Sequence, residues 1–332
     1  MMNICPRFIL IGLKGCDSLL KIGVQTKNAI DDKEPQKGYE LLKKSGFDCV
    51  DFSLNSYLLN TDLYKSKLNK FFDKSDNELE KYFSSHKKAA KESGITIHQM
   101  HMPYPNYVPN GSDELNNYLR NVVAPKSMNI CKYLECRYIV IHGFKLAYNF
   151  GSEQAEWEYT EDFLHSILPY AKENGITVCI ENLYGSIAGR IVEGPCCDAR
   201  KAVERIDKIN DIYSADVLGF CFDTGHANLV GLDFERFITT LGDRLKVLHI
   251  HDNDGIGDLH QIPFTFTRTR ENTTSTDWDG FIRGLRNINF DKVLSFETAP
   301  VLTAFPNEMK ENALRFIGEI GRYFSEKISE GR

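Results

Sequence analysis

Eight short apolar runs, separated by longer helical patterns, constrain the fold of this chain more than any other feature. Three of the runs begin directly after a glycine that ends a helical pattern, namely Gly46, Gly94 and Gly175. Apolar runs of this length with helices between them indicate strands of a parallel sheet that is buried on both faces. The predicted strands are 8–13, 47–54, 95–102, 138–142, 176–181, 217–223, the start of 245–260, and 293–297.

Repeated strand–helix units allow two architectures, a closed (β/α)8 TIM barrel and an open doubly wound sheet. The open sheet is less favoured, because no GxGxxG fingerprint of a dinucleotide fold follows the first predicted strand. Polar residues also fall at the carboxyl end of nearly every predicted strand, which is the face where barrel sites are built. We therefore predict an α/β fold in which the 332 residues form a single TIM-barrel domain, 1–332.

The stretch 245–260 concentrates groups that can carry chemistry. It begins as a strand, with His249 and His251 on one face and apolar residues on the other. The apolar pattern then stops in an acidic, glycine-containing loop that leads to Asp258 and His260. Imidazole nitrogens and carboxylate oxygens are the ligands that zinc and manganese take in proteins, although a solvated acidic turn has the same composition.

Ionisable residues end most of the other predicted strands as well. A lone buried carboxylate costs several kcal/mol, and several carboxylates at one barrel mouth repel one another, so a divalent cation would relieve both costs. A solvated strand end explains any one of these residues, but it explains poorly why all of them fall at the same end. The residues are His101, His142, Glu181, Asp223, His226, His249, His251, Asp258, His260 and Glu297.

The ordered series of strand-end motifs resembles the xylose isomerase-like TIM barrel superfamily. That group holds sugar and sugar phosphate isomerases and epimerases, inosose dehydratases and the DNA-repair enzyme endonuclease IV. The resemblance runs from the third predicted strand to the last helix. The motifs are His-Met-Pro-Tyr (101–104), Val-Ile-His-Gly (140–143), Ile-Glu-Asn (180–182), Phe-Asp-Thr-Gly-His (222–226), His-Ile-His-Asp-Asn (249–253), Asp-Leu-His (258–260) and Phe-Glu-Thr (296–298).

The resemblance implies a divalent-metal-dependent sugar or sugar phosphate isomerase or epimerase that works through an enediolate. The implied metal is Zn²⁺ or Mn²⁺, with Mg²⁺ or Co²⁺ as alternatives, and Glu181 and Glu297 are the implied acid and base. His226 would position or protonate a substrate oxygen, and a dehydratase with the same metal belongs to the same class. The implied metal ligands are Glu181, Asp223, His249 and Glu297; the implied substrate contacts are His101, His142, His251 and Arg190, for which packing or hydrogen bonding to a ligand is the plainer role.

Endonuclease IV supplies the alternative, a trinuclear zinc phosphodiesterase that acts on abasic-site DNA. Its cluster adds positions that match His101, His142, His226, Asp258 and His260, and all five are present. The formal net charge of −6 and the mixed charges of the predicted loops argue against a nucleic-acid partner, although local basic loops remain compatible with one. A barrel that has lost its chemistry is a third interpretation, but none of the four implied metal ligands is missing.

The segment 261–276 departs from the family pattern, which continues there with a glycine-rich turn. Arg268 and Arg270 in this segment are candidates for phosphate binding or plain solvated arginines. The nine cysteines without a regular framework, the absence of a signal-peptide layout and the lack of a run of about 20 apolar residues predict a cytoplasmic protein without a membrane partner. Barrels of this family often form homo-oligomers, but nothing in the sequence indicates a surface for one.

Overall fold

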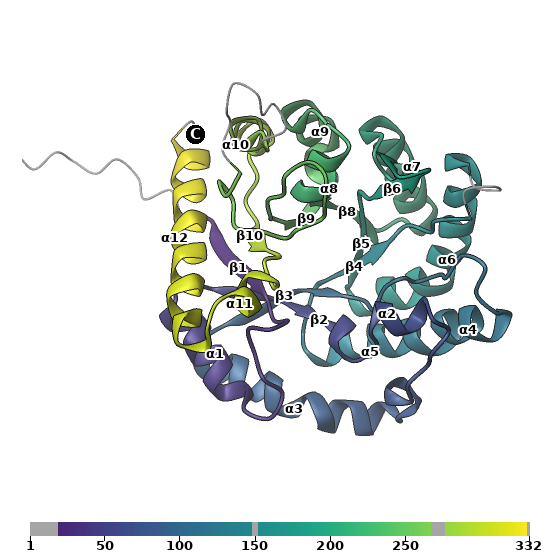
Figure 1. Cartoon of the computed structure of the whole chain (residues 1–332). Coiled ribbons are helices and arrows are strands. Elements are labelled where there is room, and N and C mark those ends of the chain that lie inside the picture. Colours follow the sequence, from purple (N-terminus) through teal and green to yellow (C-terminus); the bar gives the residue numbers. More distant parts are fainter. Residues whose placement is uncertain (1–18, 148–151, 267–275, 331–332) are drawn as a thin grey trace, which may run out of the picture.

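A barrel of parallel strands dominates the computed structural model, which describes residues 19–147, 152–266 and 276–330 (Figure 1). Among these residues, eight strands form one sheet and two short strands form a separate hairpin. Ile250 closes the sheet, because its N–H donates to the carbonyl of Ser295 at 2.9 Å and its own carbonyl accepts from the N–H of Glu297 at 3.1 Å. The strands follow one another around the barrel in the order β10 (Val293–Phe296), β1 (Lys21–Gln25), β2 (Cys49–Ser53), β3 (Thr96–His101), β4 (Tyr138–His142), β5 (Thr177–Glu181), β8 (Leu218–Asp223) and β9 (Leu245–His249).

The predicted barrel is confirmed, with one correction at its first strand. Seven of the predicted runs contain an observed strand, whereas the predicted run 8–13 lies outside the described residues. The barrel begins instead at β1, a segment that the sequence analysis missed because polar residues and Gly23 interrupt its apolar pattern. Gly23 is required there by packing, since a Cβ atom on it would lie 2.9 Å from Cγ1 of Val293 on the neighbouring strand.

Helices surround the sheet and cover its outer face (Figure 1). The sequence Ser75-Asp-Asn-Glu78 predicts a capping box, and the structure confirms it at the start of α3. Gly94 and Gly175, which the pattern predicts to end helices, take the left-handed conformation there. The helices are α1 (Pro35–Lys44), α2 (Asn60–Leu63), α3 (Asp76–Ser93), α4 (Asp113–Tyr118), α5 (Ala124–Tyr133), α6 (Glu153–Asn174), α7 (Ala199–Tyr213), α8 (Thr224–Leu229), α9 (Phe234–Leu241), α10 (Trp278–Asn287), α11 (Val301–Ala304) and α12 (Lys310–Ser329).

From the sequence, the glycines and proline of the segment 183–197 predict a loop, but a β-hairpin occupies part of it. Its strands, β6 (Tyr184–Ile187) and β7 (Arg190–Glu193), pair antiparallel. Ala188 and Gly189 form the two-residue turn between them with φ values of 49° and 77°. Positive φ at both turn residues is the geometry that favours a tight hairpin, so the loop prediction was wrong at this point.

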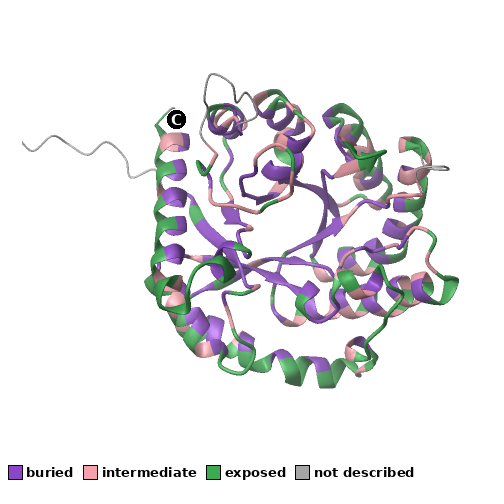
Figure 2. Cartoon of the chain, viewed as in Figure 1, coloured by how far each residue is buried: buried purple, intermediate pink, exposed green. Residues whose placement is uncertain are grey.

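Below the carboxyl ends of β4, β5, β8 and β9, the interior of the barrel is apolar. Tyr138, Val140, Cys179, Cys221 and Val247 form a small buried cluster inside the barrel, separate from the larger core between strands and helices. Figure 2 shows the buried strands ringed by helices that are exposed on their outer faces. The apolar cluster forms a floor, and the polar residues at the carboxyl ends of the strands lie above it.

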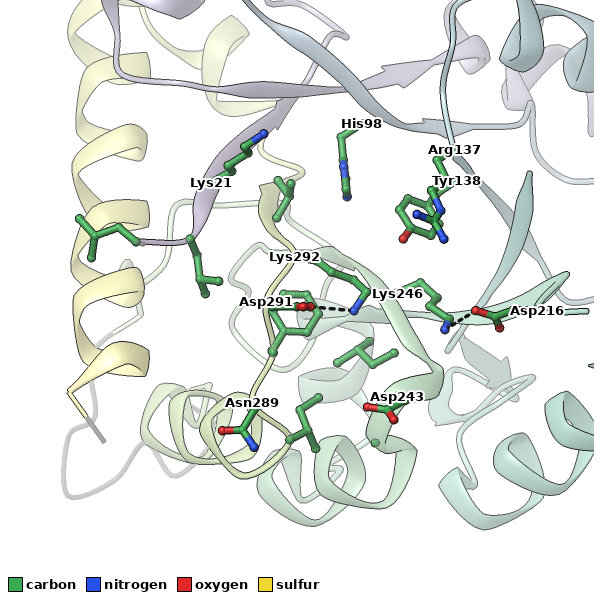
Figure 3. A pocket seen from close by; sticks show the side chains of 17 residues that line it. Lys21, His98, Arg137, Tyr138, Asp216, Asp243, Lys246, Asn289, Asp291 and Lys292 are labelled. Atoms are coloured by element: carbon green, nitrogen blue, oxygen red, sulfur yellow. Dashed lines mark hydrogen bonds and ion pairs between the residues drawn. The ribbon is translucent and has the colours of Figure 1, made fainter. Parts of the chain in front are cut away.

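A cavity of about 890 Å³ opens at the opposite end of the barrel, where the strands begin (Figure 3). Both basic and acidic side chains line it. Lys246 pairs with Asp216 at 2.7 Å, and Lys292 pairs with Asp291 at 3.0 Å. Because sites of TIM barrels are built at the carboxyl ends of the strands, we assign the chemistry to the other mouth.

Candidate metal centre

Glu181, at the carboxyl end of β5, is the centre of the site. Its side chain is 1% exposed and is surrounded by imidazoles from four other chain segments. Oε2 lies 3.5 Å from Nε2 of His101, 3.3 Å from Nε2 of His142 and 3.4 Å from Nδ1 of His249. Oε1 lies 3.1 Å from Nδ1 of His226. The structure thus brings together the ends of β3, β4, β5 and β9 and the first turn of α8 around one carboxylate.

His249 links Glu181 to the last strand. Its Nδ1 lies 3.2 Å from Oε2 of Glu297, in addition to its contact with Glu181. Gln25 at the end of β1 donates from Nε2 to the other oxygen of Glu297, Oε1, at 2.5 Å. The two glutamates that the resemblance implies as acid and base therefore approach the same imidazole nitrogen from two different strands.

Asp223, the fourth implied ligand, ends β8 and begins α8. Its Oδ1 accepts from the backbone N–H of His226 at 2.6 Å, which caps the helix, and its Oδ2 lies 3.0 Å from Nε2 of His251. Asn182 fixes the strand end by accepting from the backbone N–H of Asp223 and donating to its carbonyl, both at 2.9 Å. The sequence Asp-Thr-Gly-His thus folds into a capped turn that holds both Asp223 and His226 at the barrel mouth.

Asp258 lies between two histidines of the outer part of the site, His226 and His260. Its Oδ2 lies 3.4 Å from Nε2 of His226 and 3.3 Å from Nε2 of His260. The rings of His251 and His260 stack with their centroids 3.9 Å apart. These residues come from α8 and from the segment that follows β9, so the loop returns its Asp and His to the site as the spacing of 249–260 predicts.

The pKa values of the inner residues are shifted in opposite directions. Burial would raise the pKa of Glu181, but the imidazoles of His249 and His142 hold it well below its usual range. Burial would lower the pKa of His249, but Cys221 and Glu297 raise it well above its usual value. For His142, burial prevails and lowers the pKa to about 4.

In the outer part of the site, around Asp258, burial and neighbouring charges again shift the pKa values in opposite directions. Burial would raise the pKa of Asp258, but His226 and His260 lower it strongly. Burial would lower the pKa of His260, but Asp258 raises it to about 9. The carboxylates of both the inner and the outer residues thus attract positive charge. Protonated imidazoles can supply it, and so can a divalent cation with neutral imidazoles.

The donor set fits a divalent cation. Oε2 of Glu181 and Nδ1 of His249 are buried, and neither makes a hydrogen bond within the described part of the chain. Nitrogen and oxygen donors of this kind suit zinc or manganese. Potential ligand atoms lie within 4.8 Å of one another in the groups Asp223, His249, Glu297; Glu181, Asp223, His226; His101, His142, Glu181; and His251, His260, Glu297.

Gly225 carries a strict steric requirement at the site. A Cβ atom at this position would lie 1.9 Å from Cε1 of His251, which is far inside van der Waals contact. We expect Gly225→Ala to displace this ring from Asp223, to destabilise the protein by about 1–3 kcal/mol and to weaken cation binding. Thermal melting and titration with Zn²⁺ measure both effects.

Gly257→Ala is the matched control, because its Cβ would meet only the side chain of Leu259, at 3.2 Å. This side chain is 38% exposed and can move aside. Equal stability and equal Zn²⁺ affinity in both variants would contradict the steric role assigned to Gly225.

Several residues of the site were not predicted. Asp51 on β2 lies 3.0 Å from Nε2 of His249, and the ring of Tyr104 stacks on His142 with centroids 4.6 Å apart. The ring of Tyr184 lies 5.3 Å from that of His226. An acid inside the buried run Cys-Val-Asp-Phe-Ser was the signal for Asp51. Tyr104 ends the motif His-Met-Pro-Tyr, which was the signal for it, but no pattern in the sequence marks Tyr184.

Arg190 stays a prediction. It begins β7 in the hairpin, is exposed, and makes no ion pair with the cluster among the residues that the structure describes. Arg268 and Arg270 lie outside the described residues. The other ten predicted residues converge at one barrel mouth.

Comparison with known sequences places the chain in a known group. A family model described as "Xylose isomerase-like TIM barrel" matches residues 39–319. The uncharacterized protein y4fM of Sinorhizobium fredii is 36% identical over 86 residues, which are 26% of this chain and 25% of that protein. Inosose dehydratase of Geobacillus kaustophilus is 28% identical over 98 residues, which are 30% of this chain and 28% of the dehydratase. The chain therefore matches little more than a quarter of the length of these two relatives.

Solved structures share the whole barrel. D-psicose 3-epimerase, crystallised in the presence of D-fructose, superposes with a TM-score of 0.61 at 15% identity and covers 92% of this chain and 99% of its own. The IolI protein with a bound zinc atom gives a TM-score of 0.60 at 16% identity, with 94% and 99% covered. At such low sequence identity, the structural similarity establishes the fold alone.

Proposed function

This chain belongs to the xylose isomerase-like TIM barrel family, and from that premise we propose that it is a divalent-metal-dependent sugar isomerase or epimerase. The observation that carries the proposal is the approach of two carboxylates, from Glu181 and Glu297, to the same nitrogen of His249 at 3.4 and 3.2 Å. Isomerisation beside a carbonyl needs one group to remove a proton from carbon and another to return it. The buried carboxylate of Glu181 and the partly buried carboxylate of Glu297, at the ends of different strands, meet this need.

The residues of the proposed metal site provide four donors from four strands. A divalent cation, proposed to be Zn²⁺ or Mn²⁺, supplies Lewis-acid polarisation of a substrate carbonyl when it is bound. Glu181 and Glu297 then exchange the proton of the neighbouring carbon, while His226 holds or protonates a substrate oxygen through an imidazole nitrogen. The proposed ligands are Glu181, Asp223, His249 and Glu297.

A sugar is the proposed substrate class. The rings of Tyr104 and Tyr184 lie against His142 and His226, so they place apolar faces beside the polar centre. Such a surface suits a polyol, which has apolar C–H faces between hydroxyl groups. The names of an inosose dehydratase and of a D-psicose 3-epimerase among the similar proteins support the same class.

Within the described ranges, no helix has the length and apolarity needed to cross a bilayer.

Exchange of a carbon-bound proton with solvent tests the reaction. We expect the Mn²⁺- or Zn²⁺-loaded protein to incorporate deuterium from D2O into at least one member of a panel of ketoses, aldoses, their phosphates and an inosose, at the carbon next to the carbonyl. Proton NMR and mass spectrometry of the recovered sugars measure this. No exchange and no new product across the panel would argue against the proposal.

A specific observation favours a second candidate, an endonuclease IV-like trinuclear zinc phosphodiesterase. His226, Asp258 and His260 converge in addition to the four central residues, as a cluster of several cations requires. The formal net charge of −6 weighs against DNA as the substrate. Cleavage of a duplex that contains one abasic site, without activity on the sugar panel, would favour this candidate.

A further inference from the structure

Asp51 lies in the barrel interior directly behind His249. It is in the middle of β2, its side chain is fully buried, and its Oδ2 lies 3.0 Å from Nε2 of the imidazole. A buried ion pair is weak evidence for stability, because replacement of both partners by apolar residues of similar volume is often neutral or stabilising. The position therefore calls for an explanation other than stability of the fold.

The two nitrogens of His249 face different partners. Nε2 faces Asp51, whereas Nδ1 faces Glu181 at 3.4 Å and Glu297 at 3.2 Å. A neutral imidazole can offer a lone pair on only one nitrogen, and the other must then carry the proton. With the carboxylate of Asp51 next to Nε2, the proton belongs on that nitrogen, and the lone pair is left on Nδ1.

Gln99 on β3 holds Asp51 in this position. Its Nε2 donates to Oδ2 of Asp51 at 3.2 Å and to the backbone carbonyl of Leu248 at 3.3 Å. The amide thus ties the carboxylate to the residue that precedes His249 on β9. Carboxylate, amide and imidazole form one buried chain that crosses the barrel from β2 through β3 to β9.

We propose that Asp51 is a positioning residue for the cation site: it fixes the orientation of His249 and the nitrogen that this imidazole presents to the metal. This inference rests on the metal site of the proposed function. Partners of this kind behind a ligating histidine fix its tautomer and raise its basicity, and their loss typically lowers metal affinity about 10- to 100-fold. The position of Asp51 predicts the same dependence here.

The test measures binding of Zn²⁺ alone, by competition with a chromophoric chelator, and the visible absorption of the Co²⁺-loaded protein. We expect Asp51→Ala to weaken Zn²⁺ binding roughly 10- to 100-fold. Asp51→Asn should weaken it less, because an amide oxygen can take the place of the carboxylate oxygen that faces Nε2. Both substitutions should alter the Co²⁺ spectrum, which reports the ligand geometry and does not depend on the stability of the fold.

Asp48→Asn is the matched control, since Asp48 lies just before the same strand but pairs with Arg322 at 2.7 Å, away from the site. It should leave the affinity and the Co²⁺ spectrum unchanged. Folded Asp51 variants that bind Zn²⁺ like the wild type with an unchanged Co²⁺ spectrum, even at lower melting temperature, would overturn the positioning role and leave the proposed function intact. A wild-type protein that binds neither cation would overturn both.

Discussion

Replacing Glu181 by glutamine is expected to abolish cation binding at micromolar metal concentrations and to lower kcat/KM by roughly 10²- to 10⁴-fold. The side chain of Glu181 faces four imidazoles, and glutamine removes the negative charge that they share. Glutamine also cannot take up a proton from carbon, so the proposed acid–base pair is broken. Titration with Zn²⁺ and turnover of a substrate found by deuterium exchange measure the two losses.

Glu193→Gln is the matched control, because Glu193 is an exposed glutamate at the end of the hairpin strand β7. Its replacement should leave metal binding and turnover close to wild type. If Glu181→Gln folds and retains full turnover, Glu181 has neither of the proposed roles. Circular dichroism of each variant separates loss of chemistry from loss of fold.

Removing the divalent cation with a chelator is expected to abolish turnover and to lower the stability of the folded protein. Glu181, Asp223 and Glu297 meet at one barrel mouth, and a cation relieves their repulsion. A cation present at about 1,000 times its Kd adds roughly 4 kcal/mol to the free energy of unfolding. Thermal melts and activity assays with and without chelator, followed by stepwise return of Zn²⁺ or Mn²⁺, measure both effects.

The number of cations that restore activity distinguishes the two candidate reactions. About one per chain is the expected result for the sugar isomerase, and near three zinc ions per chain would favour the phosphodiesterase. Asp258→Asn sharpens the test, because it removes the carboxylate between His226 and His260 but leaves the four central ligands. Turnover and melting temperature that do not change after complete removal of metal would refute metal dependence.

The spacing of apolar residues, and the glycines that end helices, were sufficient to predict most of the barrel. An apolar run that ends in Glu181 or Asp223 is a strand whose last residue reaches the carboxyl end of the sheet, so the sequence also predicted where these residues lie. Parallel strands in a closed barrel bring these ends together whatever their separation along the chain. The convergence of the ten strand-end residues from His101 to Glu297 could therefore be predicted from the sequence alone.

The features that were missed depend on contacts across the barrel. β1 lacks a continuous apolar pattern because Gly23 is imposed by Val293 on the neighbouring strand, which is remote in sequence. Asp51 is an isolated acid in an apolar run, and only the approach of β9 explains it. The hairpin could have been predicted, because Ala188-Gly189 is a plausible tight turn between the two strands. The glycines of this segment were instead interpreted as signs of a loop.

The closure of the sheet at Ile250 has a consequence for the opening fluctuations of the barrel. Ile250 follows His249 directly, and one of its two closing hydrogen bonds is accepted from Glu297. The seam between the two ends of the sheet thus runs through two proposed ligands of the same cation. If the proposed cation binds there, opening of the seam and release of the cation would be thermodynamically linked. A bound ion would hold β10 and β9 together, and any fluctuation that parts these strands would weaken its binding.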